Sequence, residues 1–118
     1  MQIKETKNKD IFEVFFTDEE SRLASSIIGN TFSGASLWRI LPENFEKEVG
    51  IAYNRASELS DMILAYTSIP LSKEELQAIK KMTGRLFGLW DEGDFSTMIG
   101  TEKSEVGILI KEFEKNGI

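Results

Sequence analysis

The stretch ENFEKEVGIAYNRASELSDMILAY, residues 43–66, carries the most regular apolar pattern of the chain. Apolar or small residues recur there at alternating steps of four and three: Phe45, Val49, Ala52, Ala56, Leu59, Ile63 and Tyr66. Because an α-helix has 3.6 residues per turn, this heptad spacing places them on one side of a helix. The sequence therefore predicts one helix over about 43–66, about 36 Å long, at the centre of the fold.

Two features of this predicted helix bear on its neighbours. Ala52 and Ala56 lie at its middle, where small side chains let a second helix approach closely. Ile51, Met62 and Leu64 lie off the heptad seam and predict contacts on further sides. The same seam is compatible with a homodimer, but a seam of only about three heptads favours an internal helix pair.

Two capping boxes predict helix starts on either side of this stretch. In each, a Ser or Thr is followed three positions later by a Glu: Thr17 with Glu20, and Ser72 with Glu75. The first helix is expected to end at Gly29-Asn30, because both residues tolerate left-handed geometry. The second, over 72–90, is expected to pack antiparallel against helix 43–66. Its apolar stripe is Leu76, Ile79, Met82, Leu86 and Leu89, widened by Phe87 and Trp90.

The ends of the chain add a hairpin and a last helix. Residues 2–6 and 11–17 flank a polar tetrapeptide, and the second run is rich in β-branched and aromatic residues. This favours a β-hairpin whose second strand is covered on both faces; a short helix using Ile11, Val14 and Phe15 is the alternative. Near the other end, an apolar face predicts a helix closed by Asn116-Gly117; that face is Val106, Leu109, Ile110 and Phe113.

Together these elements predict a mainly α fold, in an α+β variant. We expect a compact helical bundle around the long helix at about 43–66, with a short N-terminal β-hairpin. The chain has 118 residues, 41% of them hydrophobic and 29% charged, which is the balance of a globular protein. Since no repeat or hinge interrupts it, residues 1–118 are expected to form a single globular domain.

The residue types that are missing exclude several kinds of chemistry. The chain has no cysteine and no histidine, which excludes disulfides, thiolate zinc sites, cysteine nucleophiles and histidine-based catalysis. It has no long apolar segment and no signal-peptide pattern, so a cytoplasmic location without membrane contact is expected. Segment 91–102 has the outline of a calcium loop but lacks most of the oxygen ligands. Neither a metal nor a cofactor is therefore predicted.

Partner-binding side chains are the candidates for a functional site. Trp38 and Trp90 are large enough to anchor an interface. Each has charged neighbours: Arg39 beside the first, and Asp91, Glu92 and Asp94 after the second. The competing explanation is that both tryptophans simply belong to the core.

The function expected from these observations is protein–protein binding. The chain carries a net charge of −6 and little catalytic equipment, which favours a non-enzymatic regulator, inhibitor or immunity-type partner. One alternative is a nucleic-acid-associated regulator that uses the basic face of helix 72–90, although the overall acidity disfavours nucleic acid as a partner; that face carries Lys73, Lys80, Lys81 and Arg85. The other alternative is a small carboxylate-dependent enzyme using Glu46, Glu58 or Asp61.

Overall fold

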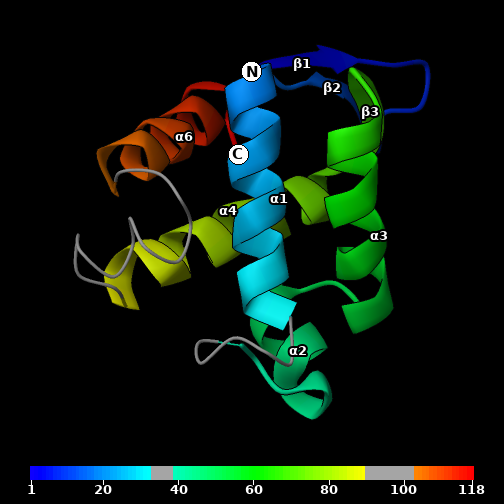
Figure 1. Ribbon diagram of the computed structural model, residues 1–118. Coiled ribbons are helices and arrows are strands. Elements are labelled where there is room, and N and C mark those ends of the chain that lie inside the picture. The colour runs from blue at the N-terminus through cyan, green and yellow to red at the C-terminus, as the bar shows by residue number, and fades with distance from the viewer. Residues whose placement is uncertain (33–38, 90–102) are drawn as a thin grey trace.

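Helices make up most of the computed structural model, which describes residues 1–32, 39–89 and 103–118 (Figure 1). The fold is mainly α with a small antiparallel sheet, as the sequence predicted. In chain order the elements are β1 (Gln2–Glu5), β2 (Ile11–Phe15), α1 (Asp18–Phe32), α2 (Pro42–Val49), α3 (Tyr53–Ala65), β3 (Ser68–Ser72), α4 (Lys73–Leu89) and α6 (Lys103–Lys115).

The predicted hairpin is present and pairs within the chain. β1 and β2 are antiparallel, with Ile3 opposite Val14, so the alternative of a short helix is wrong. β3 adds a strand on the other side of β2, with Ile69 opposite Val14. The sequence did not predict this strand, because Pro70 reads as a break. Pro70 is compatible with a strand here since β3 lies at the sheet edge, where the outward-facing backbone positions form no ladder bond.

The sheet is covered on one face only. Val14 is fully buried, and Phe12 and Phe16 pack against the core from the same face. On the opposite face Glu13 is exposed, and the Lys4 ammonium lies 5.1 Å from the centre of the Phe15 ring. The helices lie on the Val14 side of the sheet, away from the face that carries Glu13 (Figure 1). The prediction that strand 11–17 is covered on both faces therefore holds for one face.

The single long helix predicted over 43–66 is two helices. α2 ends at Gly50, whose φ of 98° is left-handed and whose N–H donates to the Glu46 carbonyl at 2.9 Å. Ala52 is extended, and α3 begins at Tyr53. The heptad spacing does not reveal the break, because the apolar residues of α3 continue the spacing of those in α2. Two residues of the predicted seam are not buried: Ala52, next to the break, is exposed, and Tyr66, at the far end, is 64% exposed.

An aromatic cluster fixes the break between α2 and α3. The Tyr53 ring packs edge-on against Phe45 and Phe32, with centroids 5.3 Å and 5.8 Å away. Its hydroxyl donates to the Phe32 carbonyl at 2.7 Å. The start of α3 is thereby attached both to α2 and to the end of α1.

The main partner of α3 is α1 and not α4, in contrast to the sequence prediction. The two helices lie side by side (Figure 1), and Ala24 and Ala56 are both fully buried. Small side chains allow a close approach, and the Ser25 and Ser60 hydroxyls meet at 2.9 Å in the interior. Each hydroxyl also lies within hydrogen-bonding distance of the other residue's carbonyl. α4 packs instead against α1 and α6.

Both capping boxes are present as predicted. The Thr17 N–H donates to Glu20 Oε1 and the Glu20 N–H to Thr17 Oγ1, at 2.9 and 3.1 Å. Ser72 and Glu75 exchange the same pair of bonds at the start of α4, at 2.9 and 3.1 Å. These reciprocal bonds satisfy amides that a helix start otherwise leaves free.

Helix α1 continues past its predicted end, to Phe32. Gly29 does not adopt the left-handed conformation that would end it. Two side chains at and just after the predicted end bond back along the helix: the Asn30 amide donates to the Ser26 carbonyl and the Thr31 hydroxyl to the Ile27 carbonyl. Thr31 is fully buried, so the last turn of α1 is held by the core.

The final helix closes as predicted. Gly117 has a φ of 81°, its N–H donates to the Glu114 carbonyl, and the Ile118 N–H donates to the Phe113 carbonyl. This pair of bonds is a Schellman motif. Among the helices that the structure describes, none is long and apolar enough to cross a bilayer.

Candidate functional site

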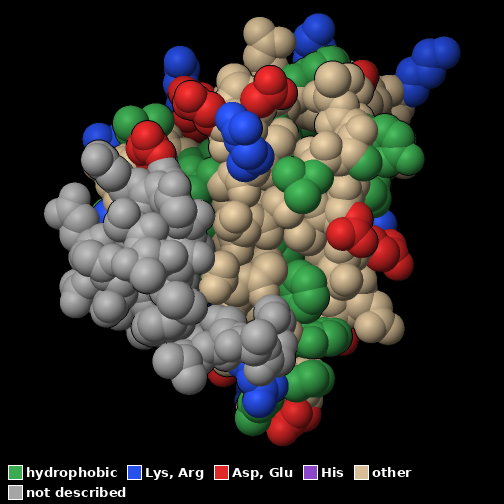
Figure 2. Space-filling model, in the orientation of Figure 1, with side chains coloured by type: hydrophobic (Ala, Val, Ile, Leu, Met, Phe, Trp, Pro, Cys, Tyr) green, Lys and Arg blue, Asp and Glu red, His purple; other side chains and the backbone are tan. Residues whose placement is uncertain are grey.

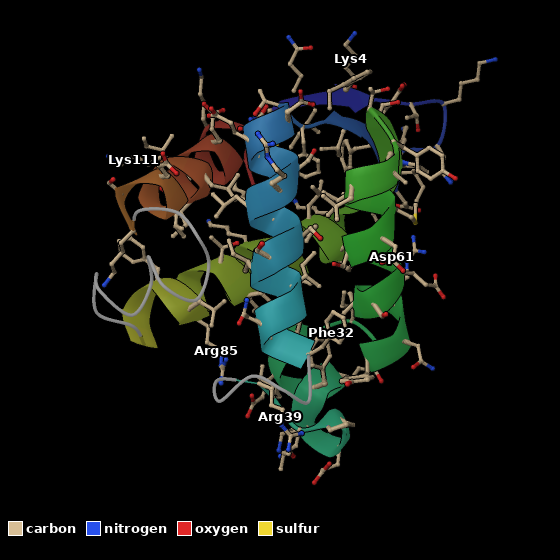
Figure 3. The ribbon with its side chains drawn as sticks, in the orientation of Figure 1. Lys4, Phe32, Arg39, Asp61, Arg85 and Lys111 are labelled. Atoms are coloured by element: carbon tan, nitrogen blue, oxygen red, sulfur yellow. The ribbon has the colours of Figure 1, made fainter. Side chains whose placement is uncertain are left out.

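Most of the side chains predicted to bind a partner lie outside the described residues. This applies to Trp38, Trp90, Asp91, Glu92 and Asp94, and also to the segment 91–102. Arg39 is described; it is exposed and lies beyond the end of α1, near α2 (Figure 3). The predicted partner site therefore stays a prediction.

The basic face of α4 is only partly exposed. Lys73 and Lys81 are exposed, whereas Lys80 and Arg85 are half-buried. The Lys80 ammonium donates to the Ile118 carbonyl at 2.9 Å, which connects α4 to the chain after α6. Nucleic-acid binding by this face likewise stays a prediction.

The carboxylates considered for catalysis do not gather in a cleft. Glu46, Glu58 and Asp61 are all exposed, and Asp61 projects from the outer side of α3 (Figure 3). Glu58 accepts a hydrogen bond from Arg55 Nη1 at 2.9 Å. In residues 1–32, 39–89 and 103–118, no group of three or more acidic side chains is placed to hold a metal ion.

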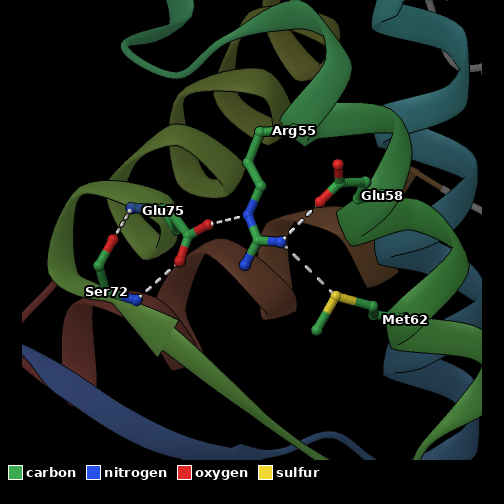
Figure 4. A network of polar contacts seen from close by, with 5 residues as sticks. All are labelled: Arg55, Glu58, Met62, Ser72 and Glu75. Carbon is green, nitrogen blue, oxygen red and sulfur yellow. Dashed lines mark hydrogen bonds and ion pairs between the residues drawn. The ribbon is translucent and has the colours of Figure 1, made fainter.

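Arg55 is the centre of the polar network that connects α3 to α4 (Figure 4). Its Nε donates to Glu75 Oε2, while the other oxygen of Glu75 accepts the Ser72 N–H of the capping box. The hydrogen bond that Arg55 donates to Glu75 raises the pKa of Arg55 above its usual value; burial opposes this and Glu58 adds to it. The network joins two helices of the described part of the chain, and its members line neither of the two hollows described below.

A cleft lies where the start of α1 meets the end of α3. It has a volume of about 270 Å³. One wall comes from the end of β2 and the first turns of α1, and the other from the last turn of α3 and the residues after it. The lining residues are Phe16, Asp18, Ser21, Arg22, Ile63, Leu64, Ala65, Tyr66 and Thr67.

The α3 wall of this cleft exposes two large apolar side chains. Leu64 is 59% exposed and Tyr66 is 64% exposed. Tyr66 follows the last turn of α3 in an extended conformation, with its N–H bonded to the Met62 carbonyl. Ile63, on the inner side of the same turn, is 1% exposed and anchors this wall in the core.

The α1 wall contributes charge. The Thr17–Glu20 capping box fixes where α1 begins, and this places Asp18, Ser21 and Arg22 along the cleft. The Arg22 side chain is exposed and makes neither a hydrogen bond nor an ion pair in the described part of the chain. Figure 2 shows acidic and basic side chains together at this end of α1, above a surface with few charges.

Comparison with protein-family models, curated proteins and solved structures finds no significant match for this chain. A function is therefore argued from the geometry. The cleft was not predicted, because its members lie far apart in the sequence and Tyr66 was assigned to the buried seam. The available signal was Leu64, an apolar residue off the heptad seam, which was predicted to contact a further side of the fold but is 59% exposed.

Proposed function

We propose that this protein acts by binding another protein, without catalysing a reaction, and that the cleft between α1 and α3 receives an apolar side chain of that partner. The observation that carries the proposal is the exposure of Leu64 and Tyr66 on one wall of a cleft. Single exposed apolar residues are ordinary on protein surfaces. Two neighbouring ones beside a hollow form an anchor site of the kind that concentrates binding energy.

The size of the cleft favours a side chain over a small-molecule ligand. Small-molecule sites commonly have volumes of about 300–1,000 Å³ and enclose most of their ligand. At about 270 Å³ this cleft is smaller and open, with room for one or two side chains. Covering Leu64 or Tyr66 would contribute about 1.5–3 kcal/mol for each side chain that becomes fully buried.

A second, wider hollow is a weaker candidate for the same role. It has a volume of about 550 Å³ and lies between the end of α2, α4 and Ile118. Charged and polar side chains line it beside Val49 and Ile118, namely Glu74, Gln77, Lys80 and Lys81, and Lys80 is already bonded to Ile118. No large exposed apolar side chain lines it.

Site-specific photo-crosslinking in the native cells tests the proposal. A photoreactive benzoylphenylalanine is placed at Tyr66, and for comparison at Lys47, which is exposed on α2. We expect a discrete protein adduct from position 66 that is absent from position 47. The additional change Leu64→Glu should abolish this adduct, because it places a charge in the apolar wall.

The opposite result is equally clear. If position 66 gives no adduct, or if the adduct forms equally from position 47 and survives Leu64→Glu, this cleft is not the binding site. Circular dichroism of the Leu64→Glu variant provides the folding control. Since Leu64 is 59% exposed, we expect its helical signal to be unchanged.

A further inference from the structure

The polar wall of the cleft carries information about the chemistry of the partner. Arg22 lines the same hollow as Leu64 and Tyr66, and its guanidinium has no bonding partner among the described residues. A guanidinium presents five N–H donors in a planar fork, a geometry that matches a carboxylate with two parallel hydrogen bonds. Cations of this kind are enriched among the side chains that dominate binding energy.

Arg22 has no bonding partner among the described residues, although the chain has more acidic than basic side chains. The chain has 20 Asp and Glu residues against 14 Lys and Arg, and three acids occupy the first turn of α1 itself. Of these, Glu20 is engaged by the capping box and by the N-terminal amino group of Met1 at 2.8 Å. Arg22 nevertheless forms no ion pair with Asp18 or Glu19, so its donors are free to meet a ligand.

Asp18 limits where a partner's carboxylate can lie. It also lines the cleft, and like charges at short range repel. Asp18 lies in the first turn of α1, where the positive end of the helix dipole compensates part of its charge. A carboxylate therefore approaches Arg22 from the side of Leu64 and Tyr66, where a docked apolar side chain would also exclude water and strengthen the ion pair.

Resting on the proposed function, we infer that the partner segment carries an Asp or Glu beside its apolar anchor, and that this carboxylate binds the guanidinium of Arg22 while the anchor contacts Leu64 and Tyr66. The two contacts are complementary. The apolar contact supplies most of the affinity, and the ion pair fixes the register of the segment and selects acidic partners.

A library of random 12-residue peptides displayed on phage is the probe for this inference. The protein is the bait, and selected peptides are synthesised with a fluorescent label for polarisation measurements. We expect the selected sequences to share an aliphatic or aromatic residue with an Asp or Glu within a few positions. Replacing that acid by its amide should weaken binding by about 10- to 100-fold, because a charge-assisted hydrogen bond is lost.

Matched variants of the protein locate the contact. Arg22→Ala should weaken binding by the same factor as the peptide amide, and the two changes together should cost little more than either alone. Lys47→Ala is the control, since Lys47 is exposed on α2, lines no part of this cleft and lacks a bonding partner among the described residues. Arg22→Glu should bind a peptide in which Lys replaces the acid.

The outcomes separate this inference from the proposed function. If Leu64→Glu and Tyr66→Ala abolish peptide binding while Arg22→Ala leaves the Kd unchanged, the acidic partner is wrong and the apolar docking site stands. If Lys47→Ala weakens binding as much as Arg22→Ala, the effect is general electrostatics and the inference fails. If selected peptides bind regardless of Leu64 and Tyr66, both the site and its charge selectivity are overturned.

Discussion

At the scale of single residues, Glu75 joins two kinds of interaction. One carboxylate oxygen accepts the Ser72 N–H and so completes the cap of α4, while the other binds Arg55 on α3. Its side chain is 12% exposed, whereas that of Glu58, the other carboxylate on Arg55, is 62% exposed. The same guanidinium therefore has one sheltered and one solvated partner. Sheltered pairs are screened less by water and salt.

We predict that Glu75→Ala lowers the free energy of unfolding by about 2 kcal/mol, because it removes a cap bond and leaves Arg55 with its solvated partner alone. Glu58→Ala, the matched control, should change it by at most about 0.5 kcal/mol. Urea denaturation followed by circular dichroism at pH 7 measures both. Equal losses in the two variants would contradict this assignment.

The Arg55–Glu75 pair should also be insensitive to alkaline pH. The folded-state pKa of Arg55 is raised, first by the Glu75 hydrogen bond. A raised pKa contributes stability that is fully present below the unfolded-state value and is lost only as pH rises through the folded value. Since the usual pKa of arginine already lies well above pH 10, the coupling energy in an Arg55→Met and Glu75→Gln double-mutant cycle should be equal at pH 7 and pH 10.

At the scale of elements, Gly50 decides between one helix and two. In a continuous helix over 43–66, replacing a mid-helix glycine by alanine would stabilise the protein. In the structure Gly50 is left-handed, with a φ of 98°. We predict that Gly50→Ala destabilises by about 1 kcal/mol, while Gly84→Ala, in the interior of α4 with no atom within 4 Å of the added Cβ, stabilises by about 0.5–1 kcal/mol.

Thermal and urea denaturation of the two glycine variants give the answer. Both changes add the same methyl group in open space, so the opposite signs isolate backbone geometry from packing. If both substitutions stabilise the protein, the prediction of one continuous helix over 43–66 is supported and the break at Gly50 is refuted.

Local signals in the sequence were sufficient for some elements and not for others. The two capping boxes and the closing Gly117 could be predicted because each depends on residues only a few positions apart. The break at Gly50 was missed because the heptad pattern records which residues are apolar and not the backbone conformation between them. β3 was missed because a proline in a strand is tolerated only at a sheet edge, which depends on tertiary pairing.

The candidate cleft was beyond prediction for a related reason. Its two walls come from segments about 40 residues apart that meet only because α1 packs against α3. That packing rests partly on the buried Ser25–Ser60 pair, and polar residues in a helix do not by themselves indicate burial. Tyr66 was assigned to the seam by its spacing, yet it lies just past the end of α3, where helical periodicity no longer applies.

At the scale of the whole molecule, one core unites the described elements. Its buried residues come from the sheet and from every described helix, with Val14, Ile28, Leu59, Ile79 and Phe113 all at or below 1% exposure. The radius of gyration is 13.4 Å, close to the value of about 13.5 Å expected for a compact chain of this length. Such a core favours cooperative unfolding, in which most elements open together.

Helix α2 is the element that should depart from this cooperative behaviour. It has 8 residues, and of these only Phe45 and Val49 are buried. Burying two such side chains contributes about 1.5–3 kcal/mol each, while ordering each residue costs about 1–2 kcal/mol. Opening α2 alone should therefore require less free energy than unfolding the core of α1 and α3.

Native-state hydrogen exchange followed by NMR tests this difference. We predict that amides in the last turn of α2, residues 47–49, exchange about tenfold or more faster than those of residues 24–28 in α1 and 59–63 in α3. The α1 and α3 amides should share one opening free energy, equal to the global value from urea denaturation. Uniform protection across all three helices would place α2 within the cooperative core and show that the aromatic contacts of Tyr53 hold it there.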